Sequence, residues 1–340
     1  MIKNCIECNK CVKECEFLKR YGNPVEVQEK IEKNILIAFE CSLCGLCEAV
    51  CSKDVKFVEF ILSKRQEAVK KGLAPLKQHK RILNFEKNAS SKIFKFYNIP
   101  KNAKKIFFPG CAFSGNSTKF VMSVFDRLKK ILNEPVGIVV DCCFKISHDL
   151  GLKDKFMKKT EEKIKIFNRY GIEEIITVCA SCTDIFRKYM PFKITTIYEY
   201  LQNEKISKNF EKVNIHDPCA LRNDNLTHSS IRKIIKNSKI EISEMTHIRE
   251  KTFCCGEGGA AGFIDRAYSK SWKKKRLKEA NYPIVVYCYG CKFFLKNRKL
   301  PVFHILDLIF ENNKTPGMIS FWMNKILLRL IGGLRIRKRG

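Results

Sequence analysis

The residues in this chain most able to do chemistry are its cysteines. There are 18 of them, and each belongs to one of four groups. Two groups are quartets with the spacing C-x2-C-x2-C-x3-C: Cys5, Cys8, Cys11 and Cys15, then Cys41, Cys44, Cys47 and Cys51. Two are quintets, made of a single cysteine, an adjacent pair and C-x2-C: Cys111, Cys142, Cys143, Cys179 and Cys182, then Cys219, Cys254, Cys255, Cys288 and Cys291. Thiols grouped in this way indicate metal or redox chemistry.

The two quartets have the spacing of iron–sulfur ligands. C-x2-C-x2-C supplies three thiolates to one [4Fe–4S] cubane, and in two-cluster ferredoxins the fourth cysteine of each run binds the other cluster. We therefore predict one cluster on Cys5, Cys8, Cys11 and Cys51, and a second on Cys41, Cys44, Cys47 and Cys15. A pair of zinc sites is the alternative, although zinc more often uses two separated cysteine pairs. Glu16 and Ser52 stand where small bacterial ferredoxins have proline, and the helix expected over 24–33 suits larger helical ferredoxin domains.

The two quintets form an internal repeat. The single cysteine, the pair and the C-x2-C of the first copy recur about 110 residues later in the second. Three interpretations compete with a cluster site: buried cysteines acting as small apolar residues, a zinc site, and a redox-active dithiol. The matched register of ten cysteines disfavours the first.

Short apolar strands alternate with amphipathic helices around both quintets. We expect strands in 104–110, 136–141, 173–178, 212–218, 239–245 and 283–287, and helices in 117–132, 155–171, 230–237 and 269–281. This alternation predicts an α/β fold with parallel sheets. Ligands of such sheets collect at the carboxyl ends of the strands, where three of the cysteine positions of each repeat fall. Each quintet is therefore expected to converge on one site.

At this point the chain resembles a known family. The quintets, with HDPCALR at 216–222 and CCGEGGAAG at 254–262, are similar to the cysteine-rich domain of heterodisulfide reductases, and of the iron–sulfur subunits of glycolate oxidase, lactate oxidation systems and anaerobic glycerol-3-phosphate dehydrogenase. The whole layout resembles the heterodisulfide reductase subunit in which a ferredoxin is fused to two such domains. The resemblance implies a helical two-cluster ferredoxin domain (1–60), a linker with a helix (61–104), two tandem Rossmann-like α/β cysteine-rich domains (105–205 and 206–312) and a basic amphipathic tail (313–340).

The same resemblance implies a non-cubane [4Fe–4S] cluster on each quintet, with paired clusters that cleave a disulfide. Gly256 follows the second pair as in the family, whereas Phe144 follows the first. Because glycine accepts positive φ and close backbone approach more easily than phenylalanine, the second copy is the better match, and zinc stays open for the first. We expect both quintets to share one cleft, with Phe144 and Gly256 near its walls.

Histidines and glycines near the quintets have alternative interpretations. His216 and Asp217 precede Cys219, where they would donate protons or order the site; we assign His216 as a catalytic candidate beside the second quintet. A structural role is the alternative for His216, and more so for His148 and His304. The spacing of the glycines after Cys255 does not match a nucleotide-binding loop.

Composition and charge restrict the class of protein and the cellular location that we expect. The chain has 340 residues, 45% of them hydrophobic, and a net charge of +30. This content excludes wholesale disorder, and no run of about 18 apolar residues predicts a membrane span. The chain starts without the apolar core of a signal peptide, so we expect a cytoplasmic location, where reducing thiols oppose disulfides. Without a recognition motif, the charge alone does not indicate a nucleic-acid partner.

The last segment has a helical pattern of its own. Ile319, Trp322, Met323, Ile326, Leu330 and Ile331 recur at helical spacing, Lys325 and Arg329 share the other side, and Arg335, Arg337, Lys338 and Arg339 close the segment. Such a helix suits the membrane interface at the cytoplasmic face. A helix docked on a partner or on the chain itself fits the pattern equally well.

Three functions fit these residues. The first is an electron-transfer oxidoreductase subunit in which single electrons pass between cubanes and non-cubane clusters that reduce a disulfide. The second is the iron–sulfur subunit of a flavin-dependent glycolate, lactate or glycerol-3-phosphate dehydrogenase that passes electrons to quinone. Both require a redox partner, such as a membrane cytochrome, a flavoprotein or a hydrogenase. The third is a zinc-binding scaffold.

Overall fold

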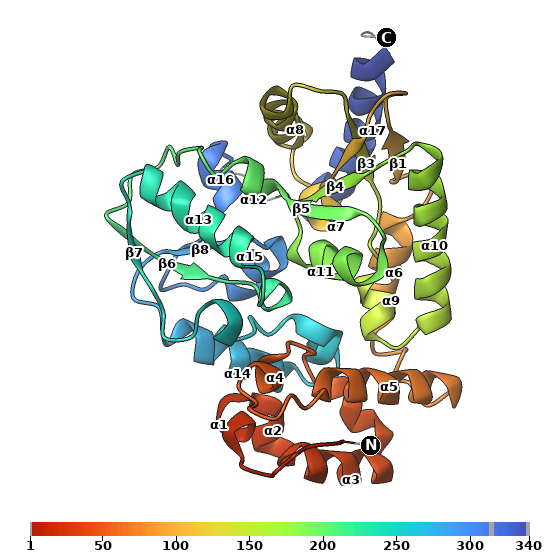
Figure 1. Ribbon diagram of the computed structural model, residues 1–340, viewed down its shortest axis with the longest axis vertical. Helices are drawn as coiled ribbons and strands as arrows, with labels where there is room; N and C mark the ends of the chain where they lie inside the picture. Colours follow the sequence, from red (N-terminus) through yellow and green to blue (C-terminus); the bar gives the residue numbers. More distant parts are fainter. Residues whose placement is uncertain (1, 313–315, 338–340) are drawn as a thin grey trace.

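Short helices surround the two quartets in the computed structural model, which describes residues 2–312 and 316–337. They are α1 (Lys10–Glu14), α2 (Glu16–Tyr21), α3 (Pro24–Lys33), η1 (Ile35–Glu40) and α4 (Leu46–Ala49). The predicted helix over 24–33 is confirmed as α3. Asn23 and Glu26 cap its start reciprocally, and Pro24 occupies its first turn, where no amide hydrogen bond is lost. Figure 1 shows these helices at one end of the molecule.

Two longer helices and a strand connect this part to the repeats. They are α5 (Phe57–Lys70), α6 (Lys80–Ala89) and β1 (Phe96–Asn98). The strand was not expected from the sequence, and it pairs antiparallel with β3 (Val136–Val140) at the edge of the first sheet. The segment between the quartets and the first repeat therefore contributes structure to that repeat.

The first repeat is a parallel sheet with the antiparallel β1 at one edge. Its strands β2 (Lys105–Phe108), β3, β4 (Glu174–Thr177) and β5 (Lys193–Thr196) lie in the order β3-β2-β4-β5. The helices between them are α7 (Gly110–Phe113), α8 (Thr118–Leu132), α9 (Lys145–Asp149), α10 (Lys153–Arg169), α11 (Ala180–Tyr189) and α12 (Ile197–Tyr200). Ser117 caps α8, since its hydroxyl accepts the amide hydrogen of Phe120.

The second repeat has the same strand order. Its sheet runs β7 (Glu241–Ser243), β6 (Lys212–His216), β8 (Ile284–Val286) and β9 (Val302–His304), all parallel. Its helical segments are η2 (Cys219–Leu221), α13 (Asn225–Asn237), η3 (Arg249–Lys251), η4 (Gly258–Phe263), α14 (Arg266–Leu277), α15 (Tyr289–Leu295) and α16 (Ile305–Ile309). The sequence prediction of two parallel α/β repeats is confirmed. Both repeats place their cysteines after corresponding strands.

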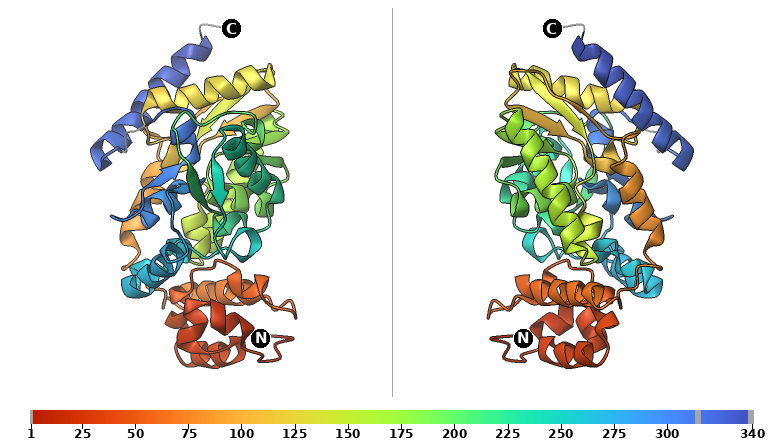
Figure 2. Two further views of the ribbon diagram at one scale, coloured as in Figure 1. Left: turned by 90° about the vertical axis from the view of Figure 1, so that its left-hand side faces the viewer. Right: turned by 90° about the vertical axis from the view of Figure 1, so that its right-hand side faces the viewer.

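One apolar core runs through both repeats. Ile138 and Ile176 from the first sheet and Ile215 and Val285 from the second belong to the same cluster of buried side chains. A separate cluster joins the helices around the quartets to the second repeat through Phe253 and Trp272. The three cysteine-bearing parts therefore share cores. Figure 2 shows the amino-terminal helices at one end of the molecule, next to the repeats.

Two buried arginines link the quartets to the repeats through hydrogen bonds to backbone carbonyls. Arg65 on α5 donates to the carbonyls of Ala38, Cys41, Asp149 and Gly259, at 2.5 to 2.9 Å. Arg222, after η2, donates to the Cys44 carbonyl at 3.0 and 3.1 Å and to that of Thr252 at 2.9 Å. Because each guanidinium bridges distant segments, the positions of the quartets are fixed by bonds formed only in the folded chain.

The last helix, α17 (Met318–Arg337), packs against α8 and β1 of the first repeat. Trp322 packs against Phe94, with ring centroids 4.6 Å apart, and Leu328 is fully buried. Docking on the chain itself, one of the sequence-based alternatives, is confirmed for this side. The prediction that Lys325 and Arg329 share one side of the helix is wrong: Lys325 is completely buried, whereas Arg329 is exposed.

The opposite side of α17 remains apolar and exposed, and its side chains are Met318, Ile319, Met323, Leu327, Leu330 and Ile331. Arg335 and Arg337 lie in the helix but their side chains are outside the described part, as are Lys338 and Arg339 entirely. Across residues 2–312 and 316–337, no helix has both the length and the hydropathy needed to cross a membrane.

Candidate iron–sulfur centres

The structure divides the quartet thiols into two groups. Cys11 lies close to Cys5 and Cys51, and these three with Cys8 line one cavity, which Cys47 of the other group also borders. Cys15 leaves its own quartet to lie beside Cys41 and Cys44. The fourth cysteine of each quartet therefore faces the other quartet, the arrangement that the spacing predicts for two cubanes.

The electrostatics of these thiols suits a metal cluster. Burial, with the neighbouring Cys5 and Cys51, raises the pKa of Cys11 to about 11. Burial raises the pKa of Cys41 to about 12, although the nearby Arg65 charge opposes the rise. Crowded thiols that resist deprotonation together are held as thiolates once iron supplies positive charge. The residues present therefore fit an iron–sulfur cluster in each group.

The second quintet is assembled from the carboxyl ends of β6 and β8 and the loop after β7. Cys254 hydrogen bonds with Cys219 and Cys255, and Cys255 with Cys291, which in turn contacts Cys288. Only Cys219 of this set is partly exposed. All five thiols therefore converge, as the strand pattern predicts.

The first quintet is assembled in the same way. Cys111 contacts Cys142, Cys143 contacts Cys142 and Cys182, and Cys182 contacts Cys179. The two quintets also meet, because Cys179 hydrogen bonds with Cys288. This contact shows that the two repeats bring their cysteines together, while a shared cleft with Phe144 and Gly256 near its walls stays a prediction.

A third contact joins the quintets to the quartets. The Cys254 thiol donates to Cys44 and is the main cause that lowers the pKa of Cys44 to about 6. Arg222, which binds the Cys44 carbonyl, adds its charge to this effect. A row of thiols thus extends from the second quartet through the second quintet to the first.

The residue after each cysteine pair has a positive φ, and its amide donates to the first sulfur of the pair, in both repeats. Gly256 has φ 101° and its amide donates to Cys254 Sγ at 3.2 Å. Phe144 has φ 59° and its amide donates to Cys142 Sγ at 3.4 Å. The expectation that phenylalanine would not readily take this conformation is therefore corrected. The buried ring of Phe144, under the Lys163 ammonium at 4.3 Å, holds the backbone in the left-handed region.

His216 lies beside the second quintet. One of its ring nitrogens lies within 4.8 Å of both Cys255 Sγ and Cys291 Sγ, and the residue is fully buried. Neither ring nitrogen satisfies hydrogen-bond geometry with any described residue. Burial lowers the pKa of His216, while Cys255 opposes that shift. A buried imidazole this close to two thiols is suited to contact a group that those thiols bind.

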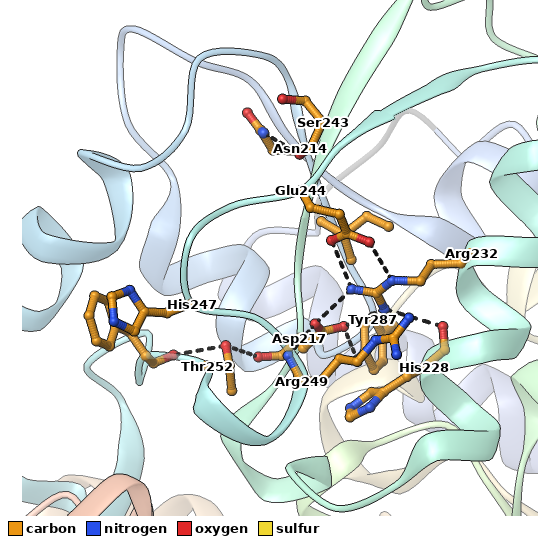
Figure 3. A network of polar contacts seen from close by, with 12 residues as sticks. Asn214, Asp217, His228, Arg232, Ser243, Glu244, His247, Arg249, Thr252 and Tyr287 are labelled. Carbon is orange, nitrogen blue, oxygen red and sulfur yellow. Dashed lines mark hydrogen bonds and ion pairs between the residues drawn. The ribbon is translucent and has the colours of Figure 1, made fainter. Parts of the chain in front are cut away.

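Asp217 has a different position from His216. Its carboxylate accepts hydrogen bonds from both terminal nitrogens of Arg232 at 3.0 Å, from the Tyr287 hydroxyl at 2.6 Å and from the Arg249 amide at 2.7 Å (Figure 3). Its carbonyl accepts the Thr252 hydroxyl at 2.8 Å. Asp217 therefore stabilises, through hydrogen bonds, the loop that leads to the Cys254–Cys255 pair.

His148 and His304 have structural partners. The His148 ring contacts the Asp149 carboxylate and the Tyr189 hydroxyl, both at 2.9 Å. His304 accepts the Leu306 amide at the start of α16 and stacks on Tyr289, with centroids 3.8 Å apart. These contacts agree with the structural interpretation of both residues.

Glu257 is a residue at this site that the sequence reasoning missed. Part of its side chain is exposed to solvent. The surrounding protein still removes water from the carboxyl group, and this effect, with the charges of Cys255 and Cys179, raises the pKa of Glu257 to about 8. Gly290 makes room for it, since a Cβ there would lie 2.1 Å from Glu257 Oε2. The sequence feature that could have identified Glu257 is its position as a single acidic residue inside the glycine-rich segment after the cysteine pair.

Comparison with known proteins agrees with this division. Residues 106–187 and 213–296 match the cysteine-rich domain family, and residues 4–56 match the 4Fe-4S dicluster domain. A subunit of the dihydromethanophenazine:CoB–CoM heterodisulfide reductase of Methanosarcina acetivorans is 23% identical, covering 82% of this chain and 83% of that protein. An uncharacterized iron–sulfur protein of Methanococcus maripaludis and a subunit of the fumarate reductase (CoM/CoB) of Methanothermobacter marburgensis are each 24% identical, covering 91% of this chain and 72% of the relative.

A solved structure extends the likeness to the fold. A hypothetical protein from Helicobacter pylori aligns over 87% of this chain and 68% of its own, with a TM-score of 0.51 and 9% sequence identity. The likeness concerns the fold alone. The matched domains and the converging thiols lead to one conclusion. The chain is an iron–sulfur protein in which a 4Fe–4S dicluster domain precedes two domains of the cysteine-rich family, similar to the heterodisulfide reductase subunit of Methanosarcina.

Proposed function

We propose that this chain is the electron-transfer subunit of an oxidoreductase that reduces a disulfide at its paired quintets. The observation that carries the proposal is the row of thiols, in which Cys44 contacts Cys254 and Cys288 contacts Cys179. It supports a path for single electrons from one end of the chain to the boundary between the two repeats. The relatives named as disulfide and fumarate reductase subunits support the same class of reaction.

The proposed ligands follow the four thiol groups. Two cubanes are assigned to the crossed quartets, and two non-cubane [4Fe–4S] clusters to the quintets. Phe144 shares with Gly256 a positive φ and an amide that donates to the first sulfur of the pair, which supports a cluster over zinc in the first quintet. The shared strand order of the repeats, in which the first strand lies between the second and third, supports the Rossmann-like description. The proposed domain limits are 1–60, 61–104, 105–205, 206–312 and 313–340, with the differences that α5 continues across residue 60 and that β1 of the linker pairs with the first sheet.

The clusters, when bound, supply single-electron transfer. Reduction of a disulfide to two thiols consumes two electrons and two protons, breaking one S–S bond and forming two S–H bonds. Two adjacent quintets allow each substrate sulfur its own electron donor. We assign to His216, beside Cys255 and Cys291, the ordering of the second quintet. Glu257 feels the charge of both Cys255 and Cys179, and its carboxyl is the group that would hydrogen bond with a bound thiol compound.

The alternative is an iron–sulfur subunit of a flavin-dependent dehydrogenase that passes electrons to quinone. Two observations favour it: a relative named EtfAB:quinone oxidoreductase, 23% identical over 67% of this chain, and the exposed apolar side of α17. In either case we propose a cytoplasmic protein with a redox partner (a membrane cytochrome, a flavoprotein or a hydrogenase) and peripheral membrane contact through α17. Sedimentation with anionic phospholipid vesicles, compared between the protein and a Met323→Glu variant, tests that contact.

The deciding experiment uses protein prepared without oxygen. Iron and sulfide analysis should give about sixteen irons per chain if all four sites hold four-iron clusters. The chemically reduced protein is then mixed with the heterodisulfide of coenzymes M and B, and thiol release is measured. Thiol release that is lost in Cys288→Ser but kept in Cys8→Ser with this direct reductant supports disulfide reduction. Iron without thiol release favours the relay, and zinc without iron or sulfide contradicts both functions.

A further inference from the structure

We propose that α17 holds Lys325 as a fixed cation beside the first quintet and thereby raises the reduction potential of the cluster bound there. The inference rests on the proposed function, because it requires a cluster on Cys111, Cys142, Cys143, Cys179 and Cys182. It assigns a positioning role to a helix that lies outside both cysteine-rich domains (Figure 2).

The docking of α17 is specific at the end nearest the first quintet. Asn324 donates to the Gly115 carbonyl at 3.0 Å, and its own carbonyl accepts the Thr118 hydroxyl at 3.3 Å. Phe321 lies so close to Gly115 that a Cβ there would approach its ring to 2.0 Å. Gly115 follows α7, the helix that carries Cys111. The helix therefore crosses the segment that presents the first thiol of the quintet.

Lys325 points inward from this contact. Its side chain is completely buried, and its ammonium has no hydrogen-bond partner among residues 2–312 and 316–337. The acidic groups that act on it are Cys111, Cys142 and Asp141. The rings of Phe321 and Trp322, with centroids 5.6 and 5.3 Å from the nitrogen, cover it on its own helix.

The carboxylate among these groups already has other partners. Asp141 accepts the Tyr97 hydroxyl at 2.6 Å and the Cys142 amide at 2.7 Å, and it pairs with Lys163 at 3.3 Å. The remaining anionic character around Lys325 therefore comes from the two cysteines. A buried ammonium without a partner is strongly unfavourable unless a nearby anion compensates it. A cluster with thiolate ligands is such an anion.

The consequence is a shift of redox equilibrium. Reduction adds one negative charge to a cluster, and a fixed positive charge nearby stabilises the reduced form more than the oxidised one. In a dry site this effect exceeds that of a surface lysine, because water does not screen it. Lys325 would therefore make a cluster on the first quintet a better electron acceptor than the same cluster without this charge.

The test is an EPR-monitored redox titration of the full-length holoprotein. The signal of the first quintet is identified as the one lost in Cys142→Ser. In Lys325→Met, which keeps a similar volume, we expect the reduction equilibrium of that signal to move about tenfold toward the oxidised form, equivalent to 59 mV for one electron. Lys325→Arg keeps the positive charge and should retain most of the wild-type potential. Arg329→Met removes a charge from the exposed side of the same helix and should leave the potential unchanged.

The outcomes separate the two hypotheses. An unchanged potential in Lys325→Met, with the signal present and iron content normal, overturns the role of Lys325 but not the cluster. If Cys142→Ser removes neither iron nor a signal, the cluster assignment fails and the inference fails with it. Should Lys325→Met not fold, Lys325→Gln gives the same charge removal, and a tenfold shift there supports the proposal.

Discussion

Replacing Gly256 by alanine tests the geometry of the second cysteine pair most directly. Gly256 has φ 101°, and an added Cβ would lie 2.3 Å from the Ser269 carbonyl oxygen and 2.6 Å from Phe294 Cε1. The oxygen belongs to the backbone of α14, so it cannot move without shifting that helix. Gly72 provides a matched control: it also has positive φ, at 69°, but nothing lies within 4 Å of its added Cβ.

The difference between the two variants isolates the steric clash. A left-handed alanine costs about 1 kcal/mol at either position. Overpacking against a fixed backbone adds about 1–3 kcal/mol at Gly256 only. At about 2–4 °C per kcal/mol, Gly72→Ala should lower the unfolding temperature by about 2–4 °C and Gly256→Ala by about 4–16 °C. The amide of residue 256 would also move away from Cys254 Sγ, now 3.2 Å from it.

The assay is thermal unfolding of both anaerobically prepared variants by circular dichroism, together with iron analysis. We expect Gly72→Ala to retain full iron and Gly256→Ala to lose about four irons, those of the second quintet. Equal unfolding temperatures and equal iron contents would refute the reasoning, because they would mean that the α14 backbone does not confine this turn.

Buried contacts give four further predictions. Cys44→Ser should remove one cubane EPR signal while the quintets keep their iron; loss of all iron would contradict independent assembly. Arg65→Met leaves four buried carbonyls without a donor and should cost about 3 kcal/mol or more, measured by urea unfolding against Lys64→Met. Phe144→Gly loses about 3–5 kcal/mol of stability from ring burial and relieves about 1 kcal/mol of backbone strain, so it should lower the free energy of unfolding although glycine matches the second repeat. A more stable variant would disprove the role of the ring. For Asp217, burial alone would raise the pKa, but the Arg232 guanidinium and the Tyr287 hydroxyl hold it well below its usual range. Its stabilisation is therefore present above the unfolded-state pKa of about 4 and is lost as pH falls further, so the wild type should lose more stability on acidification than Asp217→Asn.

Much of this protein was predictable because its signals are local. Cysteine spacing is a property of short segments, and it identified the quartets, the quintets and their repeat. The capping box at Asn23 and Glu26 and the apolar strands that end at Cys111 and Cys288 are equally local, so α3, β2 and β8 lie where they were expected. The crossing of Cys15 toward Cys41 was expected because the compact cluster of a two-cluster ferredoxin requires it.

What the tertiary structure alone decided are the contacts between distant segments. Spacing does not say that Cys179 would meet Cys288, or Cys44 meet Cys254, because such pairs depend on how whole repeats pack. The helical pattern placed Lys325 on a polar side, since a periodicity argument assumes that charge faces water. The first repeat instead buries it near Cys111 and Cys142, which only the packing of the helix on that repeat could determine. Phe144 adopts a glycine-like backbone for a related reason: the packing of its ring outweighs a strain that the sequence alone would have avoided.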